Sequence, residues 1–558
     1  MRASPLRLAA LALLASAAPT AVPAALAQTV ETGYGTATAL PVGARNSVAT
    51  LEVAAGRLYA GPRLVVVEAD GRFRFEGGDP AFEPAGFQDA VVYALDAAAD
   101  GRVLVGLGFN DATADSESVV PSAAGLAVSD DGGQTWRARR APLDQPTDTT
   151  VVYGASTLPA VPLFAPGDSP PYGVALDTLG SPALYSANGL AGLRASVDDG
   201  RTWTRVVLPP DTARTLRPDA PAQFVVAPAG TCIAACETEQ PVISQFGFNF
   251  IAYAVHVDEA GDVWAGTLAG LNRSSDLDPT TGDGSWVRYD TDAARPSPVG
   301  GFCTRIVSRE IAGARDEVWA ACWPSGRPAE LAPNAEDERF GVTVWRGDDP
   351  DTGAPLFETV LLGERVYDLA FRGETAYAAG QNALFVSDDG GREWRGLRVF
   401  RGADGRPLSL RPGAAVLSVA VQGGALWAGT ADGLLRSTDD GVTWELFRAD
   451  VPPAGDAADP ERFPAAEAVA YPNPFSPRND RLARVRVDLA TAGDVRLRVF
   501  DFEMRLVREI AAPGRPAGAN EILWDGTDSG GTRVANGAYL YVVDAGGQRA
   551  RGKLLVLD

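Results

Sequence analysis

The chain has 558 residues and a formal net charge of −22, which arises from 71 acidic and 49 basic side chains. Neutralising phosphates requires basic patches, so this balance argues against nucleic acid as a partner. The same charge disfavours binding to anionic membrane surfaces.

The N-terminus has the pattern of a secretory signal over residues 1–27. Arg2 and Arg7 precede an apolar stretch, Leu8–Ala18, and Ala25-Leu26-Ala27 forms a small-residue cleavage site before Gln28. No later segment supplies the ~20 continuous apolar residues that a membrane-spanning helix needs. We therefore expect an exported chain, secreted or held at the cell surface, with no transmembrane span after maturation.

Residues 28–448 repeat one octet, Ser-x-Asp-x-Gly-x-Thr-Trp, in four near-copies and a fifth, stretched copy between Ser274 and Trp286. A short Asp side chain can accept backbone N–H bonds, Gly supplies dihedrals that other residues disfavour, and Trp offers a large apolar face. The octets therefore predict hairpin turns with a structural role. Their residues are Ser129, Asp131, Gly133, Trp136, Ser196, Asp198, Gly200, Trp203, Ser387, Asp389, Gly391, Trp394, Ser437, Asp439, Gly441 and Trp444.

Each octet closes a unit of short strands. A Gly-Leu strand such as Gly433–Arg436 precedes the octet, and before that lies a strand with an aromatic-small-Gly step such as Trp427-Ala428-Gly429. Four antiparallel strands per repeat are typical of one propeller blade. The fold class is therefore predicted as all-β, with a seven-bladed β-propeller over residues 28–448; six or eight blades stay open. The units are counted from Tyr59, Val105, Tyr185, Trp264, Trp319, Tyr377 and Trp427.

The octet resembles the Asp box of BNR-type repeats, which occur in sialidases, sortilin-type receptors, photosystem assembly factors and some glucanases. In those families the box is a structural turn away from the active site. The resemblance is therefore specific for the propeller fold and unspecific for activity.

Composition changes after the last octet. Residues 449–468 are rich in Pro and predict a linker, and residues 469–558 predict a small immunoglobulin-like β-sandwich with short alternating strands. The motif Tyr471, Pro472, Asn473, Pro474, Phe475 opens this module, and Trp524–Asp528 and Asn536–Tyr541 follow. These residues resemble the FlgD-like immunoglobulin fold and the type A sorting domains of the type IX secretion system. The resemblance implies a secretion signal read by that machinery. The sequence departs from the pattern at Met504, where the family usually has a Gly before the Arg.

The four cysteines predict disulfides, because an exported chain meets an oxidising environment. Cys232 and Cys236 lie close together in the long insertion Pro209–Phe248, and Cys303 and Cys322 fall on two strands expected to be neighbours. We expect the pairs Cys232–Cys236 and Cys303–Cys322. Zinc ligands usually come as two Cys-x2-4-Cys pairs and only one such pair exists here, so no metal site is predicted.

Catalytic patterns are scarce in this sequence. The early Arg-Ile-Pro signature of sialidases is absent, and Arg137, Arg205 and Arg395 beside the octets are typical of solvated surface. The sole histidine, His256, could line the propeller channel and act with Asp258, but it is more often a satisfied strand residue. The acidic stretches at Asp276–Gly284 and Asp348–Gly353 lack calcium-loop spacing, so neither metal nor cofactor is predicted.

These observations favour an exported, non-enzymatic propeller that binds an unknown protein or glycan on its loop-rich face, where the Pro209–Phe248 insertion is expected. Type IX secretion machinery is the expected partner of the C-terminal module. One alternative is an extracellular glycoside hydrolase with paired carboxylates, which a pocket holding two carboxylates ~5–10 Å apart would favour. Another is an envelope assembly or adhesion factor.

Overall fold

The structure is a computed structural model that describes residues 34–35, 47–68, 71–75, 90–112, 119–179, 182–234, 242–245, 247–328, 332, 334–408, 410–411, 413–448, 468–478, 480–545 and 547–558. The predicted signal at 1–27 lies outside the described residues, as does the predicted linker except for Ala468. The chain divides into two compact units: residues 1–406 with 414–448, and residues 407–413 with 449–558. No helix of the described residues is long and apolar enough to cross a membrane.

The first unit contains seven antiparallel sheets with four consecutive strands each, among its described residues. The strands are β2 (Thr50–Ala54), β3 (Arg57–Gly61), β4 (Val65–Val67) and β5 (Phe73–Phe75); β6 (Val91–Ala97), β7 (Val103–Ala112), β8 (Val119–Ser129) and β9 (Arg137–Arg139); β12 (Gly173–Asp177), β13 (Ala183–Ala187), β14 (Leu193–Ser196) and β15 (Thr204–Arg205); β19 (Ala252–Val257), β20 (Val263–Thr267), β21 (Gly270–Ser274) and β22 (Trp286–Tyr289); β23 (Phe302–Arg309), β24 (Glu317–Trp323), β25 (Gly341–Asp348) and β26 (Pro355–Val360); β27 (Val366–Arg372), β28 (Thr375–Gly380), β29 (Leu384–Ser387) and β30 (Arg395–Leu397); and β31 (Val416–Gln422), β32 (Ala425–Thr430), β33 (Gly433–Ser437) and β34 (Glu445–Phe447). β1 (Tyr34–Gly35) adds an outer strand to the first sheet.

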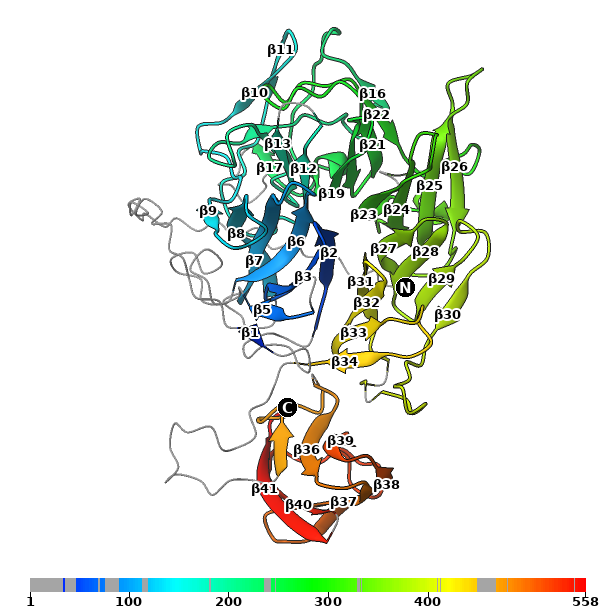
Figure 1. Cartoon of the computed structure of the whole chain (residues 1–558). Helices are drawn as coiled ribbons and strands as arrows, with labels where there is room; N and C mark the ends of the chain where they lie inside the picture. The colour runs from blue at the N-terminus through cyan, green and yellow to red at the C-terminus, as the bar shows by residue number, and fades with distance from the viewer. Residues whose placement is uncertain are drawn as a thin grey trace. The chain divides into compact units, whose positions relative to one another are not determined.

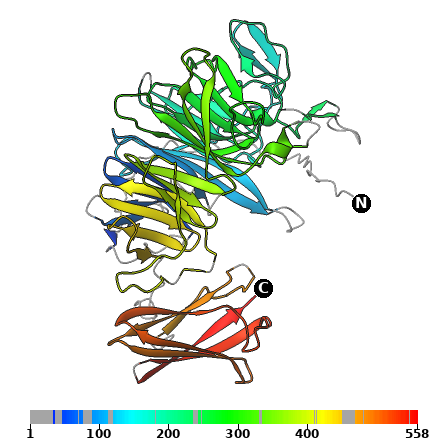
Figure 2. The same ribbon diagram turned by 90° about the vertical axis from the view of Figure 1, so that its right-hand side faces the viewer.

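The first strand of each sheet lies innermost and contacts the first strands of both neighbouring sheets. The order of contacts is β2, β6, β12, β19, β23, β27, β31 and back to β2. In Figure 1 the sheets follow one another from blue through green to yellow, and β2 lies beside β31; Figure 2 shows the same sheets from the side. The prediction of an all-β propeller is therefore confirmed.

The ring closes between the last sheet and the first without a shared strand among the described residues. The Val48 N–H donates to the Thr430 carbonyl (2.9 Å), and the Ser418 hydroxyl donates to the Val48 carbonyl (2.9 Å). The Phe73 ring packs edge-on against Trp427, with centroids 6.5 Å apart. Closure therefore depends on side-chain packing and a few hydrogen bonds rather than on a common β-ladder.

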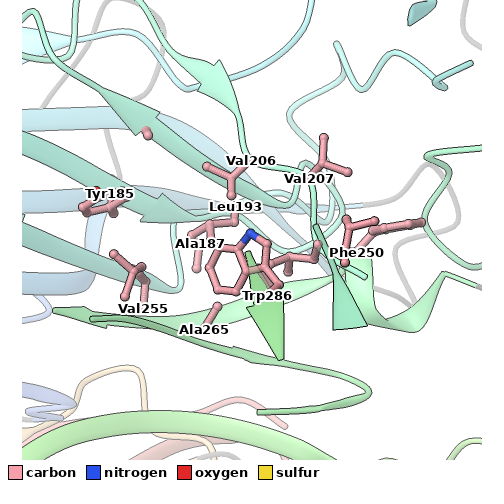
Figure 3. Packing of buried hydrophobic residues seen from close by; sticks show 14 of the residues in the cluster. Tyr185, Ala187, Leu193, Val206, Val207, Phe250, Val255, Ala265 and Trp286 are labelled. Carbon is pink, nitrogen blue, oxygen red and sulfur yellow. The ribbon is translucent and has the colours of Figure 1, made fainter. Parts of the chain in front are cut away.

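Large buried side chains fill the space between neighbouring sheets. The aromatic residues of the second strands, used above to count the units, are buried, and Trp264 lies 5.1 Å from Trp345 of the next sheet, centroid to centroid. Figure 3 shows one such core, in which Trp286 packs among Leu193, Val206 and Ala265. Burying one such ring contributes about 2 kcal/mol or more to folding, so each interface between sheets is a substantial stabilising element.

The described part of the Pro209–Phe248 insertion includes a strand at the outer edge of the propeller, and the expectation that the insertion lies on the channel face stays a prediction. Its strand β16 (Thr215–Leu216) pairs with β22, the outermost strand of its sheet, and β17 (Cys232–Ala234) pairs with β18 (Val242–Ile243). A hairpin of β10 (Thr150–Tyr153) and β11 (Ser156–Pro159) joins it, since the Ser156 hydroxyl accepts from the Ala222 N–H (3.0 Å). Hydrophobic side chains of both segments enter the core around Trp286, and that packing fixes them at the perimeter.

The second unit is a β-sandwich. One sheet has the order β35 (Ala468–Tyr471), β36 (Ala483–Leu489), β39 (Gly518–Trp524), and the other has β38 (Leu506–Arg515), β37 (Gly493–Phe500), β40 (Gly537–Ala545), β41 (Gln548–Val556). Phe475 of the Tyr-Pro-Asn-Pro-Phe motif is fully buried, with its ring 5.9 Å from Trp524. Its N–H donates to the Leu555 carbonyl (2.8 Å), and its carbonyl accepts from Leu557 (2.9 Å). The motif therefore attaches the start of the module to its last strand.

The departure from the family pattern at Met504 lies in the turn after β37. Met504 has φ = 64°, the left-handed region where a side chain is disfavoured and where Gly is the usual residue. Asp501 stabilises the turn, because its carboxylate accepts from the Arg505 N–H (2.9 Å) and side chain (2.8 Å). The strand pairing survives the substitution at a local conformational cost.

The predicted Cys303–Cys322 disulfide is not formed. The two residues are direct partners on β23 and β24, as expected, but both are buried free thiols. A register shift between Cys303 and Arg305 disturbs the ladder next to the pair, and the Cys303 thiol lies 3.8 Å from the Gly300 carbonyl as a thiol donor. Burial raises the pKa of the Cys303 thiol, which keeps it protonated. Cys236 lies outside the described residues, so the Cys232–Cys236 pairing stays a prediction.

Candidate binding site in the central channel

The seven innermost strands surround a cavity of about 990 Å³. All seven contribute lining residues, which include Glu52 of β2, Asp96 of β6, His256 of β19 and Arg305 of β23. A smaller cavity of about 130 Å³ continues toward the beginnings of these strands. Inner strands of a propeller converge on the axis, so residues distant in sequence meet here.

Arg305 organises the polar groups of the channel. Its Nε lies 2.8 Å from Asp368 of β27, and its terminal nitrogen lies 3.3 Å from the Glu52 carboxylate. Asp368 also accepts from the Val419 N–H of the next sheet (3.0 Å), and Asp96 accepts likewise from Leu176 (2.7 Å). These carboxylates join neighbouring sheets at the axis, and one guanidinium bridges two of them.

Burial dominates the ionisation of these groups. It raises the pKa of Glu52 to about 7, although the Arg305 guanidinium acts in the opposite direction. It also raises the pKa of Asp96 and of Asp368, with Arg305 again opposing the shift. Burial therefore outweighs the attraction of Arg305 at all three carboxyls, and Glu52 titrates near neutral pH.

His256 lines the channel as a neutral side chain. Its Nε2 lies 2.7 Å from the Ser308 hydroxyl on β23, and burial lowers its pKa to about 4, with Arg305 adding to the shift. The sequence suggested that His256 could act together with Asp258, but the two side chains do not pair. Asp258 instead accepts from the Trp264 indole (3.0 Å) and from two backbone N–H groups of its own turn. His256 is a satisfied strand residue at neutral pH.

An arc of aromatic side chains lies at the end of the channel that holds the small cavity, and three of them, Tyr93, Tyr172 and Tyr367, line that cavity. We call it the aromatic arc; its members are Tyr93, Tyr172, Tyr253, Phe302, Trp323 and Tyr367. Successive ring centroids lie 5.7, 4.8, 4.5, 5.5 and 5.6 Å apart. Every member is partly exposed. The arc was not predicted from the sequence, although an aromatic residue lies within two residues of the first residue of five consecutive first strands.

The Asp boxes lie at the opposite end of the channel. The Gly132 N–H donates to the Gly101 carbonyl (2.8 Å) and the Gly390 N–H donates to the Glu374 carbonyl (3.1 Å), which joins two of the boxes to the turn after a first strand. The aromatic arc lies where the first strands begin, so boxes and arc occupy opposite faces.

Each octet is a self-contained hydrogen-bonded turn. The Asp131 carboxylate accepts from the Ser129 hydroxyl (2.8 Å), the Thr135 N–H (2.8 Å) and the Thr135 hydroxyl (2.6 Å). The other boxes repeat this pattern around Asp198, Asp389 and Asp439. The Gly at the fifth position of the octet has a positive φ in all four near-copies: 81° at Gly133, 73° at Gly200, 93° at Gly391 and 85° at Gly441.

The stretched copy keeps the same chemistry. Asp276 accepts from the Ser274 hydroxyl (3.1 Å) and from the Ser285 N–H (2.6 Å) across its insertion. Asp349 likewise caps the Thr352 N–H (2.8 Å). In the described part of the chain, no group of three His, Cys, Asp or Glu is placed to hold a metal ion. Arg205, expected to be solvated, is instead mostly buried and ion-paired with Asp144.

Two family models match the chain. Residues 478–548 match the FlgD Ig-like domain, and residues 127–138 match the BNR/Asp-box repeat. Both recognitions made from the sequence are therefore confirmed. No curated protein matches the chain.

Solved structures with similar folds share little sequence with the chain. PorZ, an essential bacterial surface component of the type IX secretion system of Porphyromonas gingivalis, is 14% identical over 91% of this chain and 70% of that chain, with a TM-score of 0.29. YCF48 from Cyanidioschyzon merolae is 13% identical over 72% of this chain and 98% of that chain, with a TM-score of 0.39. FlgD from Xanthomonas campestris is 26% identical over 16% of this chain and 62% of that chain, with a TM-score of 0.12. Scores this low carry no argument about function.

Proposed function

We propose that this chain is an exported, non-catalytic binding propeller, whose C-terminal module is a signal for secretion or surface sorting. The observation that carries the binding role is the channel itself, a cavity of about 990 Å³ to which all seven innermost strands contribute. The boxes use their Ser, Asp and Thr groups within their own turns, which leaves the channel and its mouth as the recognition surface.

The sorting role is supported by the FlgD Ig-like match at residues 478–548 and by the Tyr-Pro-Asn-Pro-Phe motif. Phe475 is buried in the sandwich core, so the motif is part of a folded module. A type IX translocon that reads folded C-terminal modules is the expected partner, and the N-terminal signal at 1–27 would first carry the chain across the inner membrane.

Cell fractionation tests this proposal. We expect the full-length chain in the periplasm and a surface or secreted form whose C-terminus, determined by mass spectrometry, ends near Ala470. Deleting residues 469–558 should retain the propeller in the periplasm. An intact module in a purely periplasmic chain would contradict the sorting role and leave the module as a resident domain.

The hydrolase alternative is favoured by one observation, the raised pKa of Glu52 in the larger cavity, beside the smaller cavity that Asp368 lines. Both carboxylates, however, bind the same guanidinium, which a glycosidase acid and nucleophile would have to give up. Incubation with oligosaccharides followed by product analysis decides the matter. Release of a sugar that the Glu52→Gln variant fails to release would replace the binding proposal with an enzymatic one.

A further inference from the structure

Five consecutive sheets present a continuous set of partly exposed aromatic side chains at one mouth of the channel. Soluble proteins rarely leave such a contiguous group partly exposed without a binding role. The first strands of the other two sheets, β2 and β31, carry no aromatic residue, so the arc is open on one side. An arc of this form can receive an elongated ligand from the open side.

The rings are held in place by polar contacts at their edges. The Trp323 indole N–H donates to the Val366 carbonyl (2.8 Å), which fixes the ring between Phe302 and Tyr367. The Tyr93 hydroxyl donates to the Asn110 carboxamide oxygen (3.1 Å), and Tyr367 donates to Gln381. Because the amide oxygens are used, the amide N–H groups of Asn110 and Gln381 remain as exposed donors.

One cation lies on the arc. Arg365 stacks over Trp323, with its guanidinium carbon 4.1 Å from the ring centroid, and also over Tyr367 at 5.6 Å. Arg365 is exposed and forms no ion pair within the described part of the chain, whereas most arginines of the propeller are paired with Asp or Glu. A guanidinium in this position offers two N–H groups to a carboxylate.

We propose that the aromatic arc and Arg365 bind an acidic glycan, a chain of pyranose rings that carries carboxylates. The sugar rings pack against the exposed parts of Tyr253, Phe302 and Trp323, and a uronate carboxylate pairs with Arg365. This inference rests on the proposed function, since it names the ligand of the binding propeller.

A proline-rich peptide is the competing occupant, since such segments also dock on aromatic surfaces. Its proline residues offer only acceptors, however, because they lack the backbone N–H. Each sugar ring offers hydroxyls that both donate and accept, which matches the mixed hydroxyl and amide groups of Tyr172, Asn110 and Gln381. The chemistry of the mouth therefore favours the glycan.

Calorimetric titration of the full-length chain tests the proposal. The probes are tetragalacturonic acid, a hyaluronan tetrasaccharide and a mannuronate tetramer, with methyl-esterified tetragalacturonate as the neutral match and tetraglutamate as the peptide match. We expect at least one acidic glycan to bind with Kd on the order of 1–100 μM, and its affinity to fall as salt rises. If it is the galacturonate, its methyl ester should bind about tenfold more weakly.

Variants locate the site. Arg365→Gln should weaken acidic glycan binding about tenfold and abolish its salt dependence. Trp323→Ala should weaken binding of the acid and the ester alike by about tenfold, because it removes the stacking surface. Arg395→Gln, an exposed arginine on β30, and Phe502→Ala, an exposed aromatic of the C-terminal module, are the matched controls and should bind as the natural chain does.

Two results would overturn the proposal: none of the three glycans binds, or tetraglutamate binds as tightly as they do. Unchanged binding by Arg365→Gln, whose exposed side chain can be removed without unfolding the chain, would also overturn it. Each of these results leaves the export and sorting of the chain standing, because fractionation measures those independently.

Discussion

The ionisation of Glu52 gives the propeller a distinctive dependence on pH. Its carboxyl is raised from an ordinary pKa of 4.5 to about 7, mainly by burial in the channel. Because the folded chain holds this proton more tightly than the unfolded chain, the stability from Glu52 is fully present below pH 4.5 and is lost as the pH rises to 7. A shift of this size corresponds to about 3 kcal/mol. Glu52 retains 25% of its side-chain exposure, so water in the channel reduces the figure toward about 2 kcal/mol.

Glu52→Gln tests this reasoning, because glutamine mimics the protonated acid at every pH. The variant should match the natural chain at pH 4 and exceed its free energy of unfolding by about 2–3 kcal/mol at pH 8. Urea unfolding followed by tryptophan fluorescence reports on the propeller, since Trp524 alone of the 11 tryptophans lies beyond residue 448. Glu358→Gln, on the exposed outer strand β26, is the control and should show no such divergence.

A difference between Glu52→Gln and the natural chain that stays constant with pH would refute the raised pKa. A difference in unfolding free energy that shrinks as the pH rises would show that the attraction of Arg305 for the ionised Glu52 carboxylate outweighs the cost of burying that carboxylate.

Three further predictions follow from local geometry. Asp131→Ala removes a carboxylate that accepts four hydrogen bonds, one from Ser129, one from Gln134 and two from Thr135. Urea unfolding should show a free energy of unfolding lower by about 2–4 kcal/mol, a larger loss than in the exposed control Asp130→Ala. Hydrogen bonds lower the pKa of Asp439 to about 2 and also lower the pKa of Asp131 and of Asp389. The stabilisation by these carboxylates is therefore present above pH 4 and is lost as the pH falls toward 2. Thermal melts that show no loss of stability over this pH range would contradict the box geometry. Met504→Gly should stabilise the C-terminal module by about 1 kcal/mol in calorimetric melts, because glycine accepts φ = 64° without strain, whereas Met504→Ala should gain nothing.

The sequence was informative wherever structure is local. An Asp box closes its hydrogen bonds within eight residues, so Ser129, Asp131 and Thr135 indicate the turn without knowledge of the rest of the chain. The same holds for the module at residues 478–548, where motif and strand pattern coincide. The neighbouring positions of Cys303 and Cys322 on two strands were predicted correctly, but the predicted disulfide between them is not formed, because neighbouring positions alone do not determine whether two thiols are joined.

The channel could not be predicted, because its groups meet only after the ring has closed. Arg305 pairs with Glu52 across 253 residues and with Asp368 across 63, and nothing near any of them in sequence indicates the others. The aromatic arc could be predicted from the sequence only in part. Tyr93, Tyr253 and Tyr367 recur near the start of their units, but the buried aromatics of the second strands are the stronger repeat and conceal them.

The central claim is that this propeller binds an acidic glycan at the channel mouth and does not cut it. Saturation-transfer NMR on one sample, the full-length chain with the acidic tetrasaccharide that binds in calorimetry, measures both halves of the claim together. We expect magnetisation transfer to the sugar ring protons that is clearly weaker in Trp323→Ala, with the anomeric signals unchanged after a day. New reducing-end signals, or transfer of equal strength in the variant, would contradict this claim.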